Sequence, residues 1–418
     1  MKTIITNIGL LATPKGTAPL SGRKQGQITL MKDAYVFIDG RTIVEIGASA
    51  AASGRLKEAD KVIDAGGSLV TPGLVDAHTH LVFSGWRQRE LALKLRGLSY
   101  LDILNQGGGI LHTVKRTREA SLAELVTAGK RSLAVMLAHG TTTCEVKSGY
   151  GLTTADEIKS LEAVAQLQAC QPLDLVPTFM GAHAVPEEYK NRKQDYVELV
   201  CDEMIPAVSR RGLAEFCDVF CEDSVFDLVQ SRQILECGKH HGLKPKIHAD
   251  EITALGGAGL AGEIGALSAE HLIHASDAGL AAMARSGTIA VLLPGTSFYL
   301  NEAFARARVM IDLGIPVAVA TDFNPGSCPT ESLQTPMTIA CLKYRLTPEE
   351  VLTAVTLNAA AAIDRATSVG SIEPGKQADL VIWDAPDLEF IFYHWGVNLV
   401  NTVVKNGAVV LARGGDCR

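Results

Sequence analysis

The sequence predicts an α/β fold, a (β/α)8 TIM barrel with a small β-sandwich built from both ends of the chain. Residues 69–365 alternate strand-like and helix-like segments, which is typical of a parallel sheet. Residues 1–68 and 366–418 instead hold short β-branched runs separated by turn residues, as small antiparallel sheets do. We therefore expect a composite β-sandwich domain from 1–68 and 366–418 and a barrel domain from 69–365. An open doubly wound sheet is the alternative for the middle.

The barrel prediction depends on the number of strands in the middle of the chain. Short apolar, β-branched runs recur there between helical stretches. Parallel strands that alternate with helices form a closed barrel when there are eight of them. The sequence offers eight such strands, at residues 70–80, 141–147, 173–183, 215–222, 245–251, 268–272, 288–293 and 316–322.

The segments between the strands carry helix and loop signals. A helix is expected over residues 154–169, with Thr154 as its N-cap and Glu157 completing a capping box. Three consecutive glycines in segment 105–117 permit unusual backbone angles, so this segment is either a mobile lid or a plain flexible connection. GAGLAG, residues 257–262, matches a dinucleotide fingerprint. The preceding strand ends several residues too early for such a site, which argues against a nicotinamide cofactor.

Composition excludes several classes of protein. The net charge is −7 and no long Lys/Arg block occurs, so no nucleic-acid partner is expected. The nine cysteines are odd in number, irregularly spaced and without a CxxC pair, which favours a reduced, cytoplasmic chain. No apolar run is long enough to span a membrane, and the first residues make a poor signal peptide. An acidic substrate would need a local cation, since the overall field is negative.

A metal site is indicated by histidines at predicted strand ends. His78 and His80 lie two positions apart in one strand, so their rings share a face, and burying two imidazoles there is unfavourable unless something lies between them. His248 and Asp322 come from the fifth and eighth strands, whose carboxyl ends meet at the mouth of a barrel. Alone, each has an ordinary explanation, such as a chance HxH pair or a helix-capping aspartate. Together they suit Zn²⁺ or iron with one position left for water.

Further polar residues fall at the same predicted mouth. His183 ends the third strand, Glu251 ends the fifth and His271 ends the sixth. We expect all three near the metal, where they could act on a substrate. The remaining histidines lack this placement and are expected to be surface or core residues; they are His112, His139, His240, His241, His274 and His394.

These residues carry a family resemblance. The stretch PGLVDAHTH, residues 72–80, resembles the first-strand metal motif of the amidohydrolase superfamily. KSGYGL, GAHAVP and DFNPGS together resemble one family within it, the imidazolonepropionases, and the resemblance covers nearly the whole chain. It implies hydrolysis of the ring amide of 4-imidazolone-5-propanoate to N-formimidoyl-L-glutamate, a step of histidine degradation. It also implies a homodimer.

Carried over by position, the resemblance implies a residue set. It names one Zn²⁺ or Fe³⁺ per chain, because the fourth strand, 215–222, lacks the lysine that bridges two metals in binuclear relatives. The implied metal ligands are His78, His80, His248 and Asp322. The implied substrate contacts are Arg87, Tyr150, His183, Glu251, Asn324, Gly326 and Ser327.

Each implied residue has a chemical role to fill. Arg87 offers a guanidinium fork for the propanoate carboxylate, although it could also be a surface arginine. Asp322 would take a proton from water and return it to the leaving nitrogen, and His271 would hydrogen-bond the developing oxyanion. Glu251 and His183 would orient the ring or position water. A nucleobase deaminase or another cyclic-amide hydrolase is the near alternative, and a non-catalytic barrel that binds a small acid is the distant one.

Overall fold

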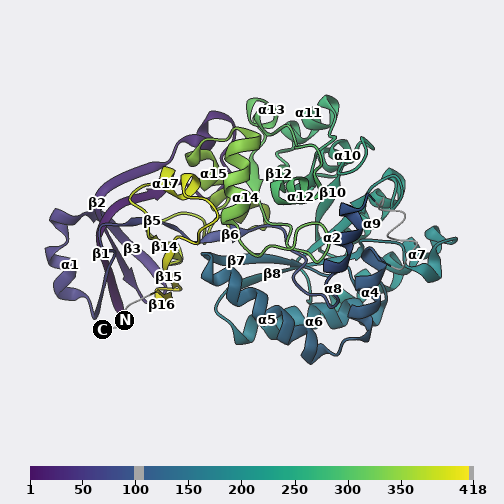
Figure 1. The fold of residues 1–418 in the computed structure, drawn as a ribbon, viewed down its shortest axis with the longest axis horizontal. Helices are drawn as coiled ribbons and strands as arrows, with labels where there is room; N and C mark the ends of the chain where they lie inside the picture. The colour runs from purple at the N-terminus through teal and green to yellow at the C-terminus, as the bar shows by residue number, and fades with distance from the viewer. Residues whose placement is uncertain (98–107, 414–418) are drawn as a thin grey trace.

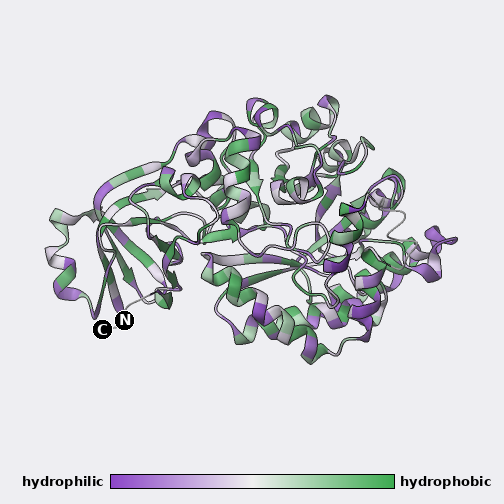
Figure 2. Cartoon of the chain, viewed as in Figure 1, coloured by the Kyte–Doolittle hydropathy of each residue, from purple (hydrophilic) through white to green (hydrophobic). Residues whose placement is uncertain are grey.

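The structure of the protein is a computed structural model that describes residues 1–97 and 108–413 (Figure 1). Two eight-stranded sheets account for its strands. One is formed by both ends of the chain and the other by its middle, so the two-part organisation expected from the sequence is present. Figure 2 shows the hydrophilic residues concentrated in the peripheral helices and turns. No helix of the described ranges is long and apolar enough to cross a membrane.

The end sheet joins the first and last strands of the chain. Its order is β16-β15-β14-β5-β1-β2-β3, with β4 paired to β1 (Figure 1). Its interior is aliphatic, with side chains such as Val36, Leu380 and Val404 fully buried. The strands are β1 Lys2–Thr13, β2 Thr29–Asp39, β3 Thr42–Ala48, β4 Lys61–Asp64, β5 Leu69–Pro72, β14 Leu380–Trp383, β15 Val400–Lys405 and β16 Ala408–Ala412.

The middle of the chain forms the expected parallel barrel. Its strands pair in sequence order from β6 to β13. The first and last strands meet through a parallel bridge between Thr79 and Phe323, next to a hydrogen bond from the Asp322 N–H to the His78 carbonyl at 3.0 Å. The strands are β6 Leu74–Asp76, β7 Thr141–Lys147, β8 Asp174–Ala182, β9 Phe216–Cys221, β10 Lys244–Ala249, β11 Ser268–His271, β12 Ile289–Leu292 and β13 Val317–Val319.

The expectation of one continuous strand over 70–80 is wrong. Residues 69–72 pair with β1 and β14 in the end sheet, and the barrel strand begins only at Leu74. The break falls at Gly73, where a Cβ atom would come within 2.3 Å of the Thr142 side chain. The division at residues 68 and 69 stays a prediction, since this short segment links the two sheets.

The eighth strand is also shorter than the expected 316–322. It ends at Val319, and Asp322 has a φ of 56°, in the left-handed region that a non-glycine residue seldom adopts. Asp322 is held there by its own N–H bond to His78. Strained backbone of this kind is often found where a side chain must be aimed at a functional site.

The helices lie between the strands along the chain. The longer ones are α2 Gln88–Leu95, α4 Ile110–Glu119, α5 Leu122–Ala138, α6 Thr154–Cys170, α9 Leu228–His240, α10 Gly257–Ile264 and α11 Asp277–Ser286. The shorter α-helices are α1 Ser53–Glu58, α7 Lys193–Leu199, α8 Ile205–Arg210, α12 Pro294–Leu300, α13 Ala307–Asp312, α14 Gln334–Ile339, α15 Pro348–Ala354, α16 Leu357–Ala362 and α17 Leu388–Tyr393. The 3-10 and π segments are η1 Gly22–Gly26, η2 Ser49–Ala51, η3 Glu187–Tyr189, η4 Val200–Met204 and η5 Ala340–Tyr344.

Three local expectations need correction or completion. The N-cap of α6 is Thr153, whose hydroxyl accepts from the Asp156 N–H, and not Thr154. Segment 105–117 is neither lid nor loop from residue 110 on, because helix α4 begins there; residues 105–107 lie outside the described ranges. GAGLAG lies inside helix α10, and the N–H groups of Gly257 and Ala258 are taken by the Asp250 carboxylate.

Candidate active site

A cavity of about 590 Å³ opens at the carboxyl ends of the barrel strands. It is the place where barrel enzymes carry their chemistry. Of the residues singled out from the sequence, only His78 does not line it, and His78 is fully buried directly beneath. The predicted residues on its wall are His80, Arg87, Tyr150, His183, His248, Glu251, His271, Asp322, Asn324, Gly326 and Ser327.

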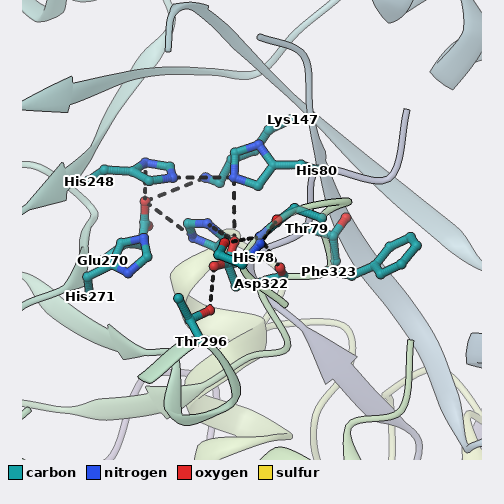
Figure 3. Close-up of polar contacts among 12 residues, drawn as sticks. His78, Thr79, His80, Lys147, His248, Glu270, His271, Thr296, Asp322 and Phe323 are labelled. Atoms are coloured by element: carbon teal, nitrogen blue, oxygen red, sulfur yellow. Dashed lines mark hydrogen bonds and ion pairs between the residues drawn. The ribbon is translucent and has the colours of Figure 1, made fainter. Parts of the chain in front are cut away.

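The four predicted metal ligands converge at the floor of this cavity (Figure 3). Nε2 of His78 lies 3.4 Å from Oδ1 of Asp322, and Nε2 of His80 lies 3.6 Å from the same oxygen. Nε2 of His248 is 3.4 Å from Nε2 of His80. A tetrahedral ion with bonds of about 2.1 Å separates its ligand atoms by about 3.4 Å, so these spacings fit a metal of that kind.

The state of the imidazoles agrees with that fit. Both ring nitrogens of His78 are buried without a hydrogen-bond partner among the described residues. Burial, followed by the charge of Lys147 and the other histidines, holds the pKa of His78 well below its usual value. Burial has the same effect on the pKa values of His80 and His248. A neutral imidazole whose ring nitrogen has a free lone pair can bind a metal ion.

Asp322 is oriented by its neighbours. The hydroxyl of Thr296 donates to Oδ2 at 2.5 Å, which leaves Oδ1 facing His78 and His80. Burial raises the pKa of Asp322 to about 7, although the bonds from Thr296 and Asn324 act in the opposite direction. A carboxyl group in this range can both hold and release a proton near neutral pH.

Arg87 lies against the backbone of Gly326. A Cβ atom at position 326 would come within 1.1 Å of Nη2 of the guanidinium, so only glycine allows this approach. The Glu90 carboxylate is 3.7 Å from Nε, and Nε has no hydrogen-bond partner in the described part of the chain. The guanidinium is therefore fixed in place with donor capacity left for an anion in the cavity.

The turn that carries Gly326 is held by Asn324. Its amide nitrogen donates to the Asp322 carbonyl and the Ser327 hydroxyl, each at 2.7 Å. Its amide oxygen accepts from the N–H groups of Gly326 and Ser327. The side chain of Asn324 is thus saturated by its own turn. Contacts between this turn and a substrate would come from its backbone or from the Ser327 hydroxyl, which accepts from Asn324 and keeps its own proton to donate.

A second turn, which follows strand β7, contains Tyr150 and contacts His183. Glu157 is buried and accepts from the N–H groups of Gly149, Gly151 and Leu152, so it fixes the loop instead of closing the predicted capping box. Nδ1 of His183 lies 3.1 Å from the Gly149 carbonyl and must donate to it, which leaves Nε2 as an acceptor. Burial lowers the pKa of His183 to about 3, so the ring is neutral.

Glu251 and His271 face each other across the cavity floor. Nε2 of His271 lies 3.5 Å from Oε2 of Glu251. Burial, with the charges of Asp322 and Glu222, raises the pKa of Glu251 to about 8. His271 has a φ of 67°, a second strained backbone position beside the ligands. With its pKa near 8, Glu251 holds a proton at neutral pH, so the pair can offer hydrogen-bond donors to a substrate oxygen or a water.

Sequence reasoning missed several residues of this site. His274 was expected to lie elsewhere but lines the cavity, as do Thr296 and Ser297, and the Ser297 hydroxyl is buried without a partner among the described residues. Beneath the floor lie the fully buried Lys147, Asp218 and Glu270. The signal for these three was present, because each is a charged residue inside an apolar barrel strand.

Comparison with known proteins decides the family. The model of the amidohydrolase family matches residues 69–410. The chain is 54% identical over 419 residues to the imidazolonepropionase of Alkaliphilus metalliredigens, covering 98% of each chain. It is 52% identical over 414 residues to that of Bacillus velezensis, covering 99% of this chain and 98% of the relative. The chain belongs to the imidazolonepropionase family of amidohydrolases.

Solved structures place the fold of this imidazolonepropionase-family chain among more distant hydrolases. Atrazine chlorohydrolase TrzN from Arthrobacter aurescens TC1, complexed with zinc, aligns with a TM-score of 0.75 at 17% identity over 98% of this chain and 95% of its own. Guanine deaminase of E. coli aligns with a TM-score of 0.72 at 15% identity, covering 99% and 100%. The family and the clustered ligand atoms together indicate a hydrolase with a metal cofactor that acts on a small molecule.

Proposed function

We propose that this chain hydrolyses the cyclic amide of 4-imidazolone-5-propanoate to N-formimidoyl-L-glutamate in L-histidine degradation. Water adds to the ring carbonyl carbon, the bond from that carbon to the ring nitrogen breaks, and the nitrogen takes up a proton. The observation that carries the proposal is one cavity with a metal-ligand set on its floor and a fixed guanidinium on its wall. A substrate with a ring amide and an anionic arm needs both.

The proposed cofactor is a single Zn²⁺ or Fe³⁺ held by His78, His80, His248 and Asp322. Three imidazole nitrogens and one carboxylate suit either metal. When bound, such an ion lowers the pKa of a bound water to about 7 and polarises a carbonyl. The fourth barrel strand, β9, contains no lysine, which supports one metal over two.

Residues on the wall of the cavity would bind the substrate. Arg87 would form paired hydrogen bonds with the propanoate carboxylate, and its rest against Gly326 holds the fork in place. The hydroxyl of Tyr150 and the backbone of residues 326–327 complete the clamp. His183 offers Nε2 as an acceptor to a ring N–H, because its Nδ1 proton already serves the Gly149 carbonyl. These contacts orient the ring with its carbonyl toward the floor.

Residues on the floor of the cavity would transfer the protons. Asp322 would take the proton of the attacking water on its carboxylate and return it to the leaving ring nitrogen. His271 would donate to the carbonyl oxygen as negative charge develops there. Glu251, 3.5 Å from His271, orients that imidazole and positions the water.

The assay that tests the function follows the ultraviolet absorbance of 4-imidazolone-5-propanoate. We expect its loss with protein, arrest of the reaction after chelation, and recovery on adding zinc or iron. Metal analysis should give about one ion per chain. No turnover of this substrate by the metal-loaded protein would refute the proposal.

Replacing Arg87 by alanine separates this substrate from the neutral rings of nucleobase deaminases. Loss of a charge-assisted bidentate contact costs about 1.5–3 kcal/mol, so KM should rise about 10–100-fold. The fold should persist, as circular dichroism would show. An unchanged KM would remove the carboxylate clamp and favour a neutral substrate.

We also propose that the protein is a cytoplasmic homodimer. Size-exclusion chromatography with light scattering would test the oligomeric state.

A further inference from the structure

A cluster of five buried charges lies in the barrel beneath the metal ligands. Its members come from four strands of the barrel, β7, β9, β10 and β11, and each is fully buried. Barrel interiors are ordinarily filled by branched aliphatic side chains. Burying charge is expensive unless every group is paired, so a cluster of this size calls for a reason beyond packing. The five are Glu145, Lys147, Asp218, Lys246 and Glu270.

Lys147 is the centre of this cluster. Its ammonium lies 2.7 Å from the Asp218 carboxylate, 2.9 Å from Glu145 and 3.5 Å from Glu270. Lys246 pairs with Glu145 at 2.8 Å and with Glu270 at 3.3 Å. The carboxylates are therefore fixed in position by two ammonium groups that come from the chain itself.

The cluster reaches the metal ligands through Asp218. The Asp218 carboxylate lies 3.1 Å from Nδ1 of His248 and also accepts from the His248 backbone N–H at 3.2 Å. A carboxylate facing Nδ1 keeps the proton on that nitrogen, so Nε2 carries the free lone pair. Nε2 is the atom that faces His80 and the proposed metal (Figure 3).

The same carboxylates could have held a second cation. Asp218, His248 and Glu270 place one ligand atom each within 4.8 Å of one another, the arrangement of a metal site. The ammonium of Lys147 lies against two of these three groups. It therefore supplies, next to these carboxylates, the positive charge that an additional ion would bring.

We propose that Lys147 and Asp218 form a positioning pair that fixes His248 for metal binding, and that the Lys147 ammonium stands in for a second metal ion. This inference rests on the proposed metal site. It gives β7 and β9 a role in metal affinity and metal stoichiometry, without contact with substrate. The single metal of the proposed cofactor then follows from a cation that the chain supplies.

Asp218→Asn tests the positioning of His248 with little change of shape. Loss of a carboxylate behind a ligating histidine typically weakens metal binding about 10–100-fold. We expect that loss when metal-free protein competes for zinc with a chromophoric chelator. The matched control is Asp379→Asn, directly before β14 of the end sheet, where Asp379 is also buried and pairs with Lys405 at 2.6 Å. The control should lower the free energy of unfolding and leave zinc affinity unchanged.

The outcomes separate the inference from the proposed function. Zinc affinity in Asp218→Asn within twofold of wild type, or an equal loss in Asp379→Asn, would overturn the inference. Failure of the wild-type protein to bind any metal would instead overturn the proposed function. If Asp218→Asn does not fold, proton NMR of cobalt(II)-loaded wild-type protein is the second measurement. The imidazole N–H of His248 should persist in heavy water, and its immediate exchange would contradict the pairing.

Lys147→Met tests the stand-in role. After equilibration with excess zinc and removal of free metal, wild type should hold one ion per chain and the variant more than one. Lys147→Gln, which keeps N–H donors without the charge, serves if the methionine variant does not fold. One ion per chain in both proteins would overturn the stand-in role.

Discussion

The interiors of the two sheets differ most in how they handle buried charge. The end sheet encloses aliphatic side chains, and its buried Lys405 is paired with Asp379 and with Asp174, the first residue of barrel strand β8. The barrel encloses the cluster of five charges, with the histidines of the cavity floor directly above it. Apolar packing is the more economical way to stabilise a core. The comparison indicates that the apolar interior of the end sheet contributes to the stability of the fold. The charged interior of the barrel is less stable than an apolar one would be, and it supports the site.

The largest expected effect falls on the barrel side of that comparison. Asp322→Asn removes both a metal ligand and the proposed proton carrier, so kcat should fall about 10³-fold or more. Steady-state assays at saturating zinc would measure it. Asp379→Asn, the buried aspartate of the end sheet, should keep its kcat. A near-normal rate in Asp322→Asn would remove its proton-transfer role.

The counterpart in the end sheet is Leu380→Ala. Leu380 is fully buried in the aliphatic interior, and deleting a buried leucine side chain typically costs about 2–5 kcal/mol. Urea denaturation should show that loss, while kcat and KM at 25 °C stay near wild type in the fraction that is folded. A large fall in kcat would contradict the separation of roles between the two sheets.

A smaller effect is expected at the wall of the cavity. Gly326→Ala places a methyl group where the guanidinium of Arg87 now lies, so Arg87 must move. We expect KM to rise about tenfold, as for loss of about one charge-assisted hydrogen bond, with kcat changed less.

The control for that variant is Gly259→Ala in helix α10, where an added Cβ meets no atom within 4 Å. It should leave KM unaltered. Equal values of KM in the two variants would mean that the position of Arg87 does not govern binding.

The same comparison explains how far the sequence could be interpreted. Strand β7 was placed without error at 141–147, because β-branched runs with regular spacing report local preference. The split at Gly73 and the early end of β13 were not, because both depend on contacts with distant segments, Thr142 in one case and His78 in the other. Local patterns cannot report a constraint that is set across the fold.

The site shows the same limit. The structure brings together His78, His80, His248 and Asp322, which spacing and family resemblance had singled out. Lys147 was assigned to no role, although it lies inside the predicted strand 141–147. Glu145 and Lys147, alternating with apolar residues in one strand, were the available clue to a charged interior. Their partners come from other strands, and only the closed barrel shows that the charges are paired.

The finest test concerns the pH dependence of the metal-free protein. The pKa of Glu251 is raised from 4.5 to about 8, mainly by burial and then by the charges of Asp322 and Glu222. Between these values the folded state holds a proton that the unfolded state releases. This group therefore makes the free energy of unfolding fall as pH rises through that window.

Glu251→Gln keeps the shape and removes the charge, so it should be more stable than wild type at pH 9 and similar to it at pH 4.5. We expect a difference on the order of 1–2 kcal/mol, well below the full shift, because the side chain is 16% exposed and water screens it. Urea denaturation of both metal-free proteins across this range would measure it, with Glu302→Gln at the exposed rim as control. A difference that is largest at acidic pH would show that Glu251 is ionised in the folded protein throughout. The barrel floor would then tolerate one more unpaired charge than its burial suggests.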